Sequence, residues 1–269
     1  MLIGRGKKSM FQRKNPWDIE WAKLIKRENK FLESRKNQKE SILNQKLEEK
    51  VPAKLQETLD KAFAKAFQLI FEKGTGVIEK TFRPEEMKKD YQIKEFTNEI
   101  RQNRKSLKAF GKKAETSGNL NLAVSGLAGV GMGILGVGIP DIPVFTGFIM
   151  KSIYEIALSY GFSYDTVEEK RFILLLIKGA VSCGDDMLTV NRLIDEYIES
   201  EAMPAGYSEA DQITKTAAGL SKELLYMKFL QGIPVVGAVG GLYDAVYMKR
   251  INEYANLKYK KRFLLKKKK

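Results

Sequence analysis

The chain has 269 residues, and its 47 Lys and Arg against 33 Asp and Glu give a formal net charge of +14 at neutral pH. It contains no histidine and a single cysteine, Cys183. Without histidine, the chain lacks the commonest general base near neutral pH, which excludes Ser-His-Asp and Cys-His catalysis and most catalytic zinc sites. A single cysteine excludes an intramolecular disulfide and suits a reducing compartment.

The positive charge is concentrated at the two ends of the chain. Residues 1–50 carry 14 Lys/Arg against 7 Asp/Glu, and residues 249–269 carry 10 against 1. No apolar segment follows the first basic residues, so we expect no secretory signal peptide and a protein at the cytoplasmic face of the cell membrane. We divide the chain into a basic N-terminal arm with a long polar helix (1–50), a helical domain (51–256) and a basic C-terminal tail (257–269).

Apolar residues in the first half recur at helical spacing. Residues 17–49 are predicted to form the long polar helix, in which Trp17 and Trp21 either pack onto the core, the reading we favour, or face anionic lipid. Residues 52–71 repeat leucine and phenylalanine every three or four positions, which predicts a core-facing helix. Residues 85–106 are predicted to form one highly charged surface helix.

The centre of the chain is an apolar segment rich in glycine. The 25 residues 116–140 carry no charge, and roughly 18 such residues suffice for a membrane span. On a helix, Gly126, Gly129, Gly133 and Gly136 would line a seam that another helix can approach closely. A proline pair separates this segment from a second apolar helix, 142–162. We expect a hairpin over residues 118–160. It either inserts into a membrane or lies buried in a soluble protein, since the length of an apolar run does not distinguish these two alternatives.

Within this segment, residues 131–136 match the dinucleotide-binding pattern G-x-G-x-x-G. That pattern needs a strand before it and a helix opening from its last glycine. Here glycine is dense throughout and a proline pair follows within a few residues. We therefore expect no cofactor.

The second half is also predicted to be helical. Residues 166–169, Thr-Val-Glu-Glu, have the types and spacing of a capping box and predict a helix start before the buried run 172–177. Further helices are expected over residues 187–201 and 210–229. A last helix is expected after Pro234, where Gly237 and Gly241 form a second small-residue seam. No stretch alternates like a strand, so the predicted class is all-α, a multi-helix bundle with a central glycine-rich hairpin.

Three polar residues form the candidate polar site. Asp141 lies between the two prolines and is best explained as the N-cap of the following helix. Lys151 and Glu155, at i,i+4, are expected to form an ion pair, either on a soluble surface or as a polar contact inside a membrane. An enzyme that uses Asp141, Glu155 or the pair Asp185-Asp186 is disfavoured because no nucleophile and base pattern accompanies them. We assign no catalytic and no metal-binding residues.

A family resemblance is carried by residues 138–148, Gly-Ile-Pro-Asp-Ile-Pro-Val-Phe-Thr-Gly-Phe, continued by Ile-Tyr-Glu-Ile-Ala at 153–157. This run resembles the EcsC family of bacteria, and the resemblance covers about Pro16 to Leu265. The family is named after a protein encoded beside the two components of an ABC transporter, and no biochemical activity is established for it. The resemblance implies a helical protein linked to the membrane, with an ABC transporter as candidate partner, and supplies no catalytic residues.

These observations favour a non-enzymatic, membrane-associated helical protein, accessory to a transport or secretion system. Basic ends suit an anionic membrane surface, which attracts each nearby Lys or Arg by about 1 kcal/mol. The alternative is a soluble basic protein that binds nucleic acid through its termini, although no recognition module is visible.

The C-terminal residues mix cations with apolar side chains. We interpret them as a peripheral anchor in contact with the membrane surface, against the simpler reading of a solvated, mobile tail. The residues assigned to this contact are Lys258, Lys260, Lys261, Arg262, Phe263, Leu264 and Leu265.

Overall fold

A computed structural model describes residues 15–36, 53–72, 76–117, 141–202, 208–230 and 242–268. Every regular element within these ranges is a helix, which confirms the predicted all-α class. The helices, in chain order, are α1 (Pro16–Lys36), α3 (Ala53–Glu72), α4 (Gly76–Glu79), α5 (Pro84–Arg101), α6 (Arg104–Ser117), α8 (Asp141–Ser159), α9 (Val167–Val181), α10 (Gly184–Ser200), α11 (Glu209–Leu230) and α12 (Leu242–Lys268).

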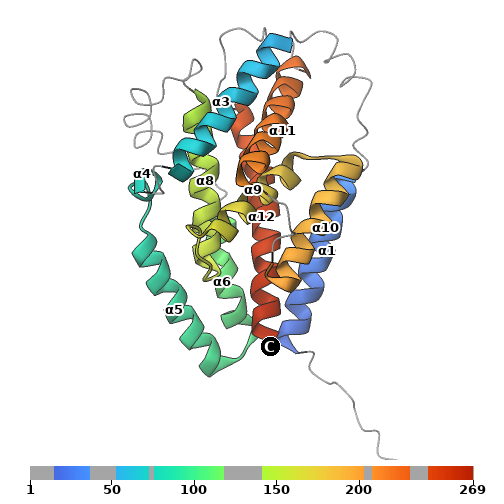
Figure 1. The fold of residues 1–269 in the computed structure, drawn as a ribbon. Helices are drawn as coiled ribbons and strands as arrows, with labels where there is room; N and C mark the ends of the chain where they lie inside the picture. The colour runs from blue at the N-terminus through green and yellow to red at the C-terminus, as the bar shows by residue number, and fades with distance from the viewer. Residues whose placement is uncertain are drawn as a thin grey trace, which may run out of the picture.

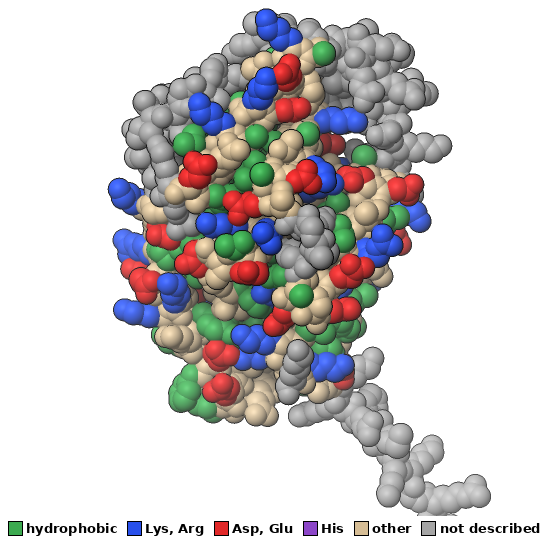
Figure 2. All heavy atoms as spheres, viewed as in Figure 1, with side chains coloured by type: hydrophobic (Ala, Val, Ile, Leu, Met, Phe, Trp, Pro, Cys, Tyr) green, Lys and Arg blue, Asp and Glu red, His purple; other side chains and the backbone are tan. Residues whose placement is uncertain are grey.

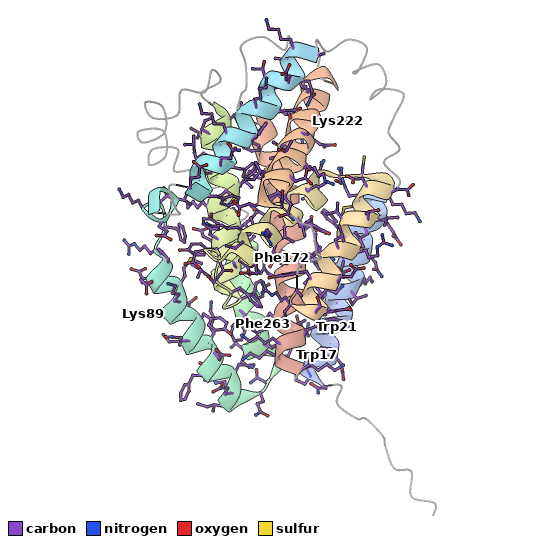
Figure 3. The ribbon with its side chains drawn as sticks, in the orientation of Figure 1. Trp17, Trp21, Lys89, Phe172, Lys222 and Phe263 are labelled. Atoms are coloured by element: carbon purple, nitrogen blue, oxygen red, sulfur yellow. The ribbon has the colours of Figure 1, made fainter. Side chains whose placement is uncertain are left out.

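The helices α9 and α12 form the centre of the bundle (Figure 1). The unbroken apolar run from Phe172 to Ile177 is buried on all sides because α10, α11 and α12 pack around α9. Helix α12 in turn packs against α1, α6, α8, α9 and α10. Figure 3 shows Phe172 in the middle of this arrangement. The hydrophobic core therefore lies mainly between α8, α9 and α12.

Helices α3 and α11 lie along each other at the upper end of the bundle (Figure 1). The apolar face predicted for residues 52–71 is confirmed, since Leu59, Phe63 and Phe67 of α3 are buried. Phe63 meets Phe145 of α8 edge to face, with 6.4 Å between the ring centroids. The spacing of apolar residues in the sequence therefore predicted correctly which face of this helix is buried.

The N-terminal helix α1 lies against the bundle, packed on α6, α10 and α12. Trp17 stacks on Trp21 with ring centroids 5.0 Å apart, and its indole Nε1 donates a 2.8 Å hydrogen bond to the carbonyl of Leu264 near the end of α12. Figure 3 shows both indoles between α1 and α12. Both tryptophans pack on the core, as favoured from the sequence. Residues 37–50 lie outside the described ranges, so the division at residue 50 stays a prediction.

The charged stretch 85–106, predicted as one helix, is two helices. Helix α5 ends at Arg101, and Gln102 takes a left-handed conformation with φ of 42°. Asn103 then starts α6, because its side-chain Oδ1 accepts a 3.0 Å hydrogen bond from the backbone N–H of Ser106. The chain turns back at this point, so that α6 packs beside both α5 and α8.

The apolar helix α8 is the second arm of the expected hairpin. Its stretch Ile142–Ser159 is long and apolar enough to cross a membrane, but 78% of it is buried inside the protein, as in the core helix of a soluble protein. The first arm, with Gly126, Gly129, Gly133 and Gly136, lies outside the described residues, as do Gly237 and Gly241. The glycine seams therefore stay predictions.

Candidate functional site

The four cations of residues 258–262 pair with carboxylates of other helices inside the bundle. Residues 257–268 are the last turns of α12, and Lys258 has no exposed surface. Its ammonium contacts Glu28 of α1 and lies 2.7 Å from the carboxylate of Asp195 of α10. Lys261 contacts the same two carboxylates at 3.2 and 3.0 Å.

Two more cations of this segment are held by buried carboxylates. Arg262 lies 2.7 Å from Glu169 of α9, and Lys260 lies 3.0 Å from Glu20 of α1. The interpretation of these four cations as a membrane-surface contact is therefore wrong for this conformation. The interpretation failed because the carboxylates that pair with these cations lie on α1, α9 and α10, far away in the sequence.

The apolar residues of the same segment are part of the core. Phe263 is buried, with its ring centroid 4.6 Å from that of Phe110 and 5.6 Å from that of Tyr160. Leu264 is buried and Leu265 is partly buried. Phe263 and Leu264 are not available to a lipid surface in this structure, so that part of the tail interpretation is also corrected.

A different surface presents large apolar side chains to solvent. On α5, Ile93, Phe96 and Ile100 are 67%, 65% and 67% exposed. Their spacing of three and four residues places them on one face of the helix. Figure 2 shows hydrophobic side chains at the lower left, over the end of α5. We call Ile93, Phe96 and Ile100 the α5 ridge.

Exposed cations surround the end of the bundle where α5 terminates. Lys105 and Lys108 are exposed on the first turns of α6, and Lys266 and Lys268 are exposed at the end of α12. The end of α12 lies against the second half of α5 here, since Lys267 of α12 forms an ion pair with Glu95 of α5. Figure 1 shows the C-terminus and the α5–α6 turn at the same end of the molecule. We call these four exposed lysines the basic rim.

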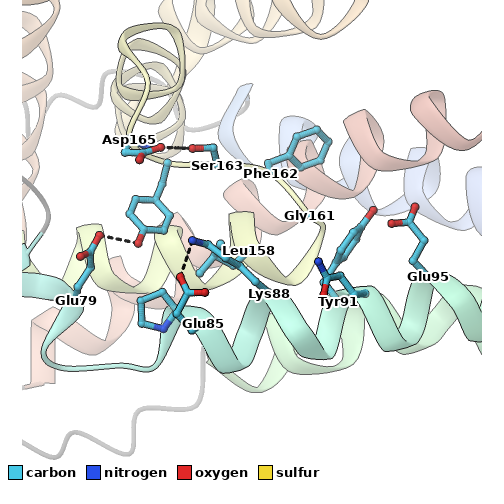
Figure 4. Close-up of a pocket in the computed structure, with 13 residues that line it drawn as sticks. Glu79, Glu85, Lys88, Tyr91, Glu95, Leu158, Gly161, Phe162, Ser163 and Asp165 are labelled. Atoms are coloured by element: carbon cyan, nitrogen blue, oxygen red, sulfur yellow. Dashed lines mark hydrogen bonds and ion pairs between the residues drawn. The ribbon is translucent and has the colours of Figure 1, made fainter.

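A groove of about 570 Å³ lies between α5 and the connection from α8 to α9 (Figure 4). One wall comes from Glu79, Pro84, Glu85, Lys88, Tyr91, Gln92 and Glu95, and the other from Leu158, Gly161, Phe162, Ser163, Tyr164 and Asp165. Hydrogen bonds fix the carboxylates at one end: Tyr164 donates to Glu79 at 2.7 Å, and Lys88 donates to Glu85 at 2.8 Å.

Gly161 allows the two walls to approach. Its φ of +78° is in the left-handed region, and a Cβ at this position would lie 2.2 Å from Cζ of Tyr91. The ring of Tyr91 therefore rests directly on the backbone of the α8–α9 connection. Burial raises the pKa of Tyr91 well above its ordinary value, and the neighbouring Glu95 raises it further. This phenol stays neutral and acts as a wall of the groove.

The model of the EcsC protein family matches residues 19–264, from the first turn of α1 to the last turns of α12. The chain belongs to the EcsC protein family. Neither a curated protein nor a solved structure matches it. The family match thus includes the buried ion pairs of α12, the α5 ridge and the groove.

In this EcsC-family protein, the candidate polar site does not form one cluster. Lys151 and Glu155 pair on α8 at 3.8 Å, both partly buried. Asp141 begins α8, and its side chain lies outside the described part of the structure. Ten residues of helix separate Asp141 from Lys151, which is about 15 Å along the axis. The backbone positions of Asp141 and Lys151 therefore lie almost three helical turns apart.

Of the pair Asp185-Asp186, the second residue has structural partners. Asp186 lies 3.4 Å from Lys178 and accepts a hydrogen bond from Ser182, so it ties the start of α10 to the end of α9. Cys183 is the N-cap residue of α10 and is partly exposed. Within the described ranges, no group of three metal-ligating side chains could hold a metal ion.

Sequence reasoning missed the α5 ridge and the groove. The ridge carries a local signal, because Ile93, Phe96 and Ile100 are apolar residues in a highly charged segment. The groove has no local signal in the sequence, because its two walls meet only when α5 packs against α8. Only the fold brings Tyr91 to Gly161.

Proposed function

We propose that this EcsC-family protein is a non-enzymatic, membrane-associated protein that contacts an anionic lipid surface at the end of the bundle formed by the α5 ridge and the basic rim. The observation that carries the proposal is the exposure of Ile93, Phe96 and Ile100 on one face of α5. Large apolar side chains in a contiguous exposed row are typical of surfaces that bind lipid or protein.

Two physical contributions support a lipid surface as the partner. Insertion of a large apolar side chain removes it from water and contributes about 1.5–3 kcal/mol. Each lysine near an anionic surface adds about 1 kcal/mol. The α5 ridge supplies the first contribution and the basic rim supplies the second. Stable peripheral binding generally needs two such signals together.

The proposed contact differs from the anchor inferred from sequence. The cations of residues 258–262 are held by Glu20, Glu28, Glu169 and Asp195, whereas Lys105, Lys108, Lys266 and Lys268 are exposed. The same pairing weakens the nucleic-acid alternative, because paired cations release few counterions when they meet phosphate. A role accessory to an ABC transporter on the cytoplasmic face rests on the family resemblance alone.

Vesicle co-sedimentation tests the proposal. We expect the full chain to bind vesicles with about 30% anionic lipid, with affinity falling as salt rises. The triple variant Ile93→Ser, Phe96→Ser, Ile100→Ser should bind at least about tenfold more weakly, because it loses three apolar insertions. The variant Lys105→Glu, Lys108→Glu should lose binding to anionic vesicles and change little on neutral ones.

The matched control removes exposed apolar side chains elsewhere. Val167 and Leu188 are 49% and 36% exposed and stand on α9 and α10. The variant Val167→Ser, Leu188→Ser should bind vesicles like the wild-type protein. Far-UV circular dichroism should be unchanged in all variants. Wild-type protein that stays in the supernatant, or a triple variant that sediments as well as the control, would overturn the proposal.

A further inference from the structure

Two neighbouring helices, α1 and α6, expose rows of cations with similar spacing. The exposed cations in the middle of α1 stand at i, i+3, i+4 and i+7, and those on the described part of α6 stand at i, i+3 and i+7. Each row therefore follows one side of its helix for about 10 Å. We call the two rows together the α1–α6 basic face: Lys23, Lys26, Arg27, Lys30, Lys105, Lys108 and Lys112.

The two rows belong to helices that lie side by side. Helix α1 packs against α6, and Nε of Arg104 lies 2.9 Å from the carboxylate of Glu20, near the start of both helices. Figure 1 shows both helices beginning at the end of the bundle where the C-terminus lies. Packed helix axes are about 8–10 Å apart. Both rows are therefore within reach of one extended anionic partner.

The cations of the basic face repel one another. On α3, α5 and α11, an exposed lysine pairs with a carboxylate one turn away. The basic face has the opposite pattern, since Lys23 stands one turn from Lys26 and Arg27. The exposed carboxylates of α1, Asp18 and Glu33, lie near its two ends. Like charges at this spacing destabilise a helix, and such departures from local preference are typical of functional surfaces. An anionic partner would relieve this repulsion.

The basic face offers charge without large apolar side chains. Among the helices that the structure describes, the exposed large apolar residues lie on α5, α9 and α10, and none lies on α1 or α6. Stable lipid binding needs apolar insertion as well as charge, and a stable protein interface buries an apolar core. Binding to nucleic acid without sequence preference needs only cations, because counterions released from the phosphates supply the affinity. This composition therefore favours nucleic acid as the anionic partner.

We propose that the α1–α6 basic face binds the phosphate backbone of a nucleic acid without preference for base sequence. The row on α1 contacts one stretch of phosphates, and the row on α6 contacts a neighbouring stretch. This activity is additional to the lipid contact, with which it shares Lys105 and Lys108. The row on α1 belongs to the nucleic-acid site alone, so substitutions in that row test the proposal.

Fluorescence anisotropy of labelled duplexes, titrated with the full-length protein, measures this binding. The probes are an A·T-rich DNA duplex, a G·C-rich DNA duplex and an RNA duplex. We expect a dissociation constant of about 1–100 µM at physiological salt. The two DNA duplexes should bind equally within about twofold, because phosphate contacts carry no sequence information. Tighter binding of the RNA duplex would assign the face to RNA, and tighter binding of the DNA duplexes would assign it to DNA.

The test variant is Lys23→Gln, Lys26→Gln, Lys30→Gln. It should bind every duplex at least about tenfold more weakly, and the slope of log affinity against log salt should fall by about 3, one unit for each lost phosphate contact. Its thermal unfolding temperature should equal or exceed that of the wild-type protein, because the substitutions remove like-charge pairs.

The matched control is Lys54→Gln, Lys61→Gln, Lys65→Gln, which removes three exposed lysines from α3. It changes the net charge equally and should bind the duplexes like the wild-type protein, within about twofold. The proposal is overturned if the wild-type protein binds no duplex at low salt, or if the control loses as much affinity as the α1 variant. Tighter binding of polyglutamate than of every duplex would also overturn it and assign the face to an acidic protein segment.

The lipid contact and the nucleic-acid site can fail separately. The serine variant of the α5 ridge should bind the duplexes like the wild-type protein, because no ridge residue belongs to the basic face. Loss of duplex binding in that variant would contradict the assignment to α1 and α6. Absence of duplex binding by the wild-type protein would leave the lipid contact standing, since its test depends on the ridge and on vesicles.

Discussion

Lys258 of α12 donates a hydrogen bond to Glu28 of α1, and the side chains are 0% and 5% exposed. Asp195 of α10 and Lys261 of α12 complete the cluster, so two cations meet two carboxylates in the interior. A buried charge is tolerated only when opposite charges and hydrogen bonds surround it. This cluster therefore fixes how α1, α10 and α12 sit against one another.

Removal of the central cation should destabilise the protein strongly. We expect Lys258→Met to lower the free energy of unfolding by about 3–5 kcal/mol, because it leaves two carboxylates with only Lys261 between them. Lys215→Met is the control, since Lys215 and Asp211 form an exposed i,i+4 pair, 60% and 57% exposed. That change should cost less than about 1 kcal/mol. Urea denaturation followed by circular dichroism compares the two, and equal costs would contradict the structural role of Lys258.

Alanine substitutions at Gly161 and Gly184 distinguish the cost of a steric clash from the cost of backbone strain. Both have positive φ, +78° and +57°, but a Cβ at Gly161 meets the ring of Tyr91 whereas a Cβ at Gly184 meets nothing within 4 Å. Gly184→Ala should cost about 1 kcal/mol of strain. Gly161→Ala should cost at least about 2 kcal/mol more, because the Tyr91 ring has to move out of contact.

A double variant isolates the steric part. Gly161→Ala should cost less in a Tyr91→Ala background than in the wild-type background, since the ring that a Cβ at residue 161 would meet is already gone. Thermal unfolding of the four proteins measures this coupling. Additive costs would show that Tyr91 does not rest on Gly161.

Arg35 joins α1 to the C-terminal end of α9. Its Nε donates to the carbonyl of Ser182 and its Nη2 to the carbonyl of Val181, both at 3.0 Å. Lysine has no planar fork to serve two carbonyls at once. Arg35→Lys should therefore lower the free energy of unfolding by about 1–3 kcal/mol. Arg192→Lys, at a position that is 70% exposed, should have almost no effect in the same assay.

Local signals explain which parts of the fold could be predicted from the sequence. The helix start predicted at Thr166 is confirmed, since the Thr166 side chain accepts from the backbone N–H of Glu169 and begins α9. The helix expected over residues 210–229 is confirmed as α11 and begins in the same way, with a 3.0 Å bond from the backbone N–H of Asp211 to the side chain of Ser208. Both depend on residues three positions apart. Helical periodicity and capping chemistry are readable at that range.

Long-range partners explain what could not be predicted. A run of lysines and apolar residues at the end of a chain is usually solvated, and the sequence does not show that Glu28, Glu169 and Asp195 will meet Lys258 to Arg262. The turn at Gln102 was missed for another reason. Most residues around it are good helix formers, and the Asn103 cap that starts α6 has only a weak sequence signal. The groove was missed because α5 meets the α8–α9 connection only through its packing on α8.

Glu20 should make the stability of the protein depend on pH. Its side chain is 1% exposed, with Arg104 at 2.9 Å and Lys260 at 3.0 Å. Burial alone would raise its pKa, but the hydrogen bonds and charges of Arg104 and Lys260 outweigh burial and hold the pKa below its ordinary value near 4.5. A carboxylate whose pKa is lower in the folded state stabilises the protein above its unfolded pKa, and loses this contribution as the pH falls through the folded pKa.

The variant Glu20→Gln should therefore be less stable than the wild-type protein by about 2 kcal/mol at pH 7, where the charged hydrogen bonds are complete. The difference should shrink below about pH 4.5, because the wild-type carboxylate becomes protonated while the glutamine does not change. Glu33→Gln, at an exposed position of the same helix, controls for the loss of a carboxylate and should leave stability at pH 7 nearly unchanged. Urea midpoints measured from pH 7 to pH 3 give the three curves. A gap between wild type and Glu20→Gln that stays constant down to pH 3 would mean that Glu20 stabilises the α1–α6–α12 junction by packing, and not by its charge.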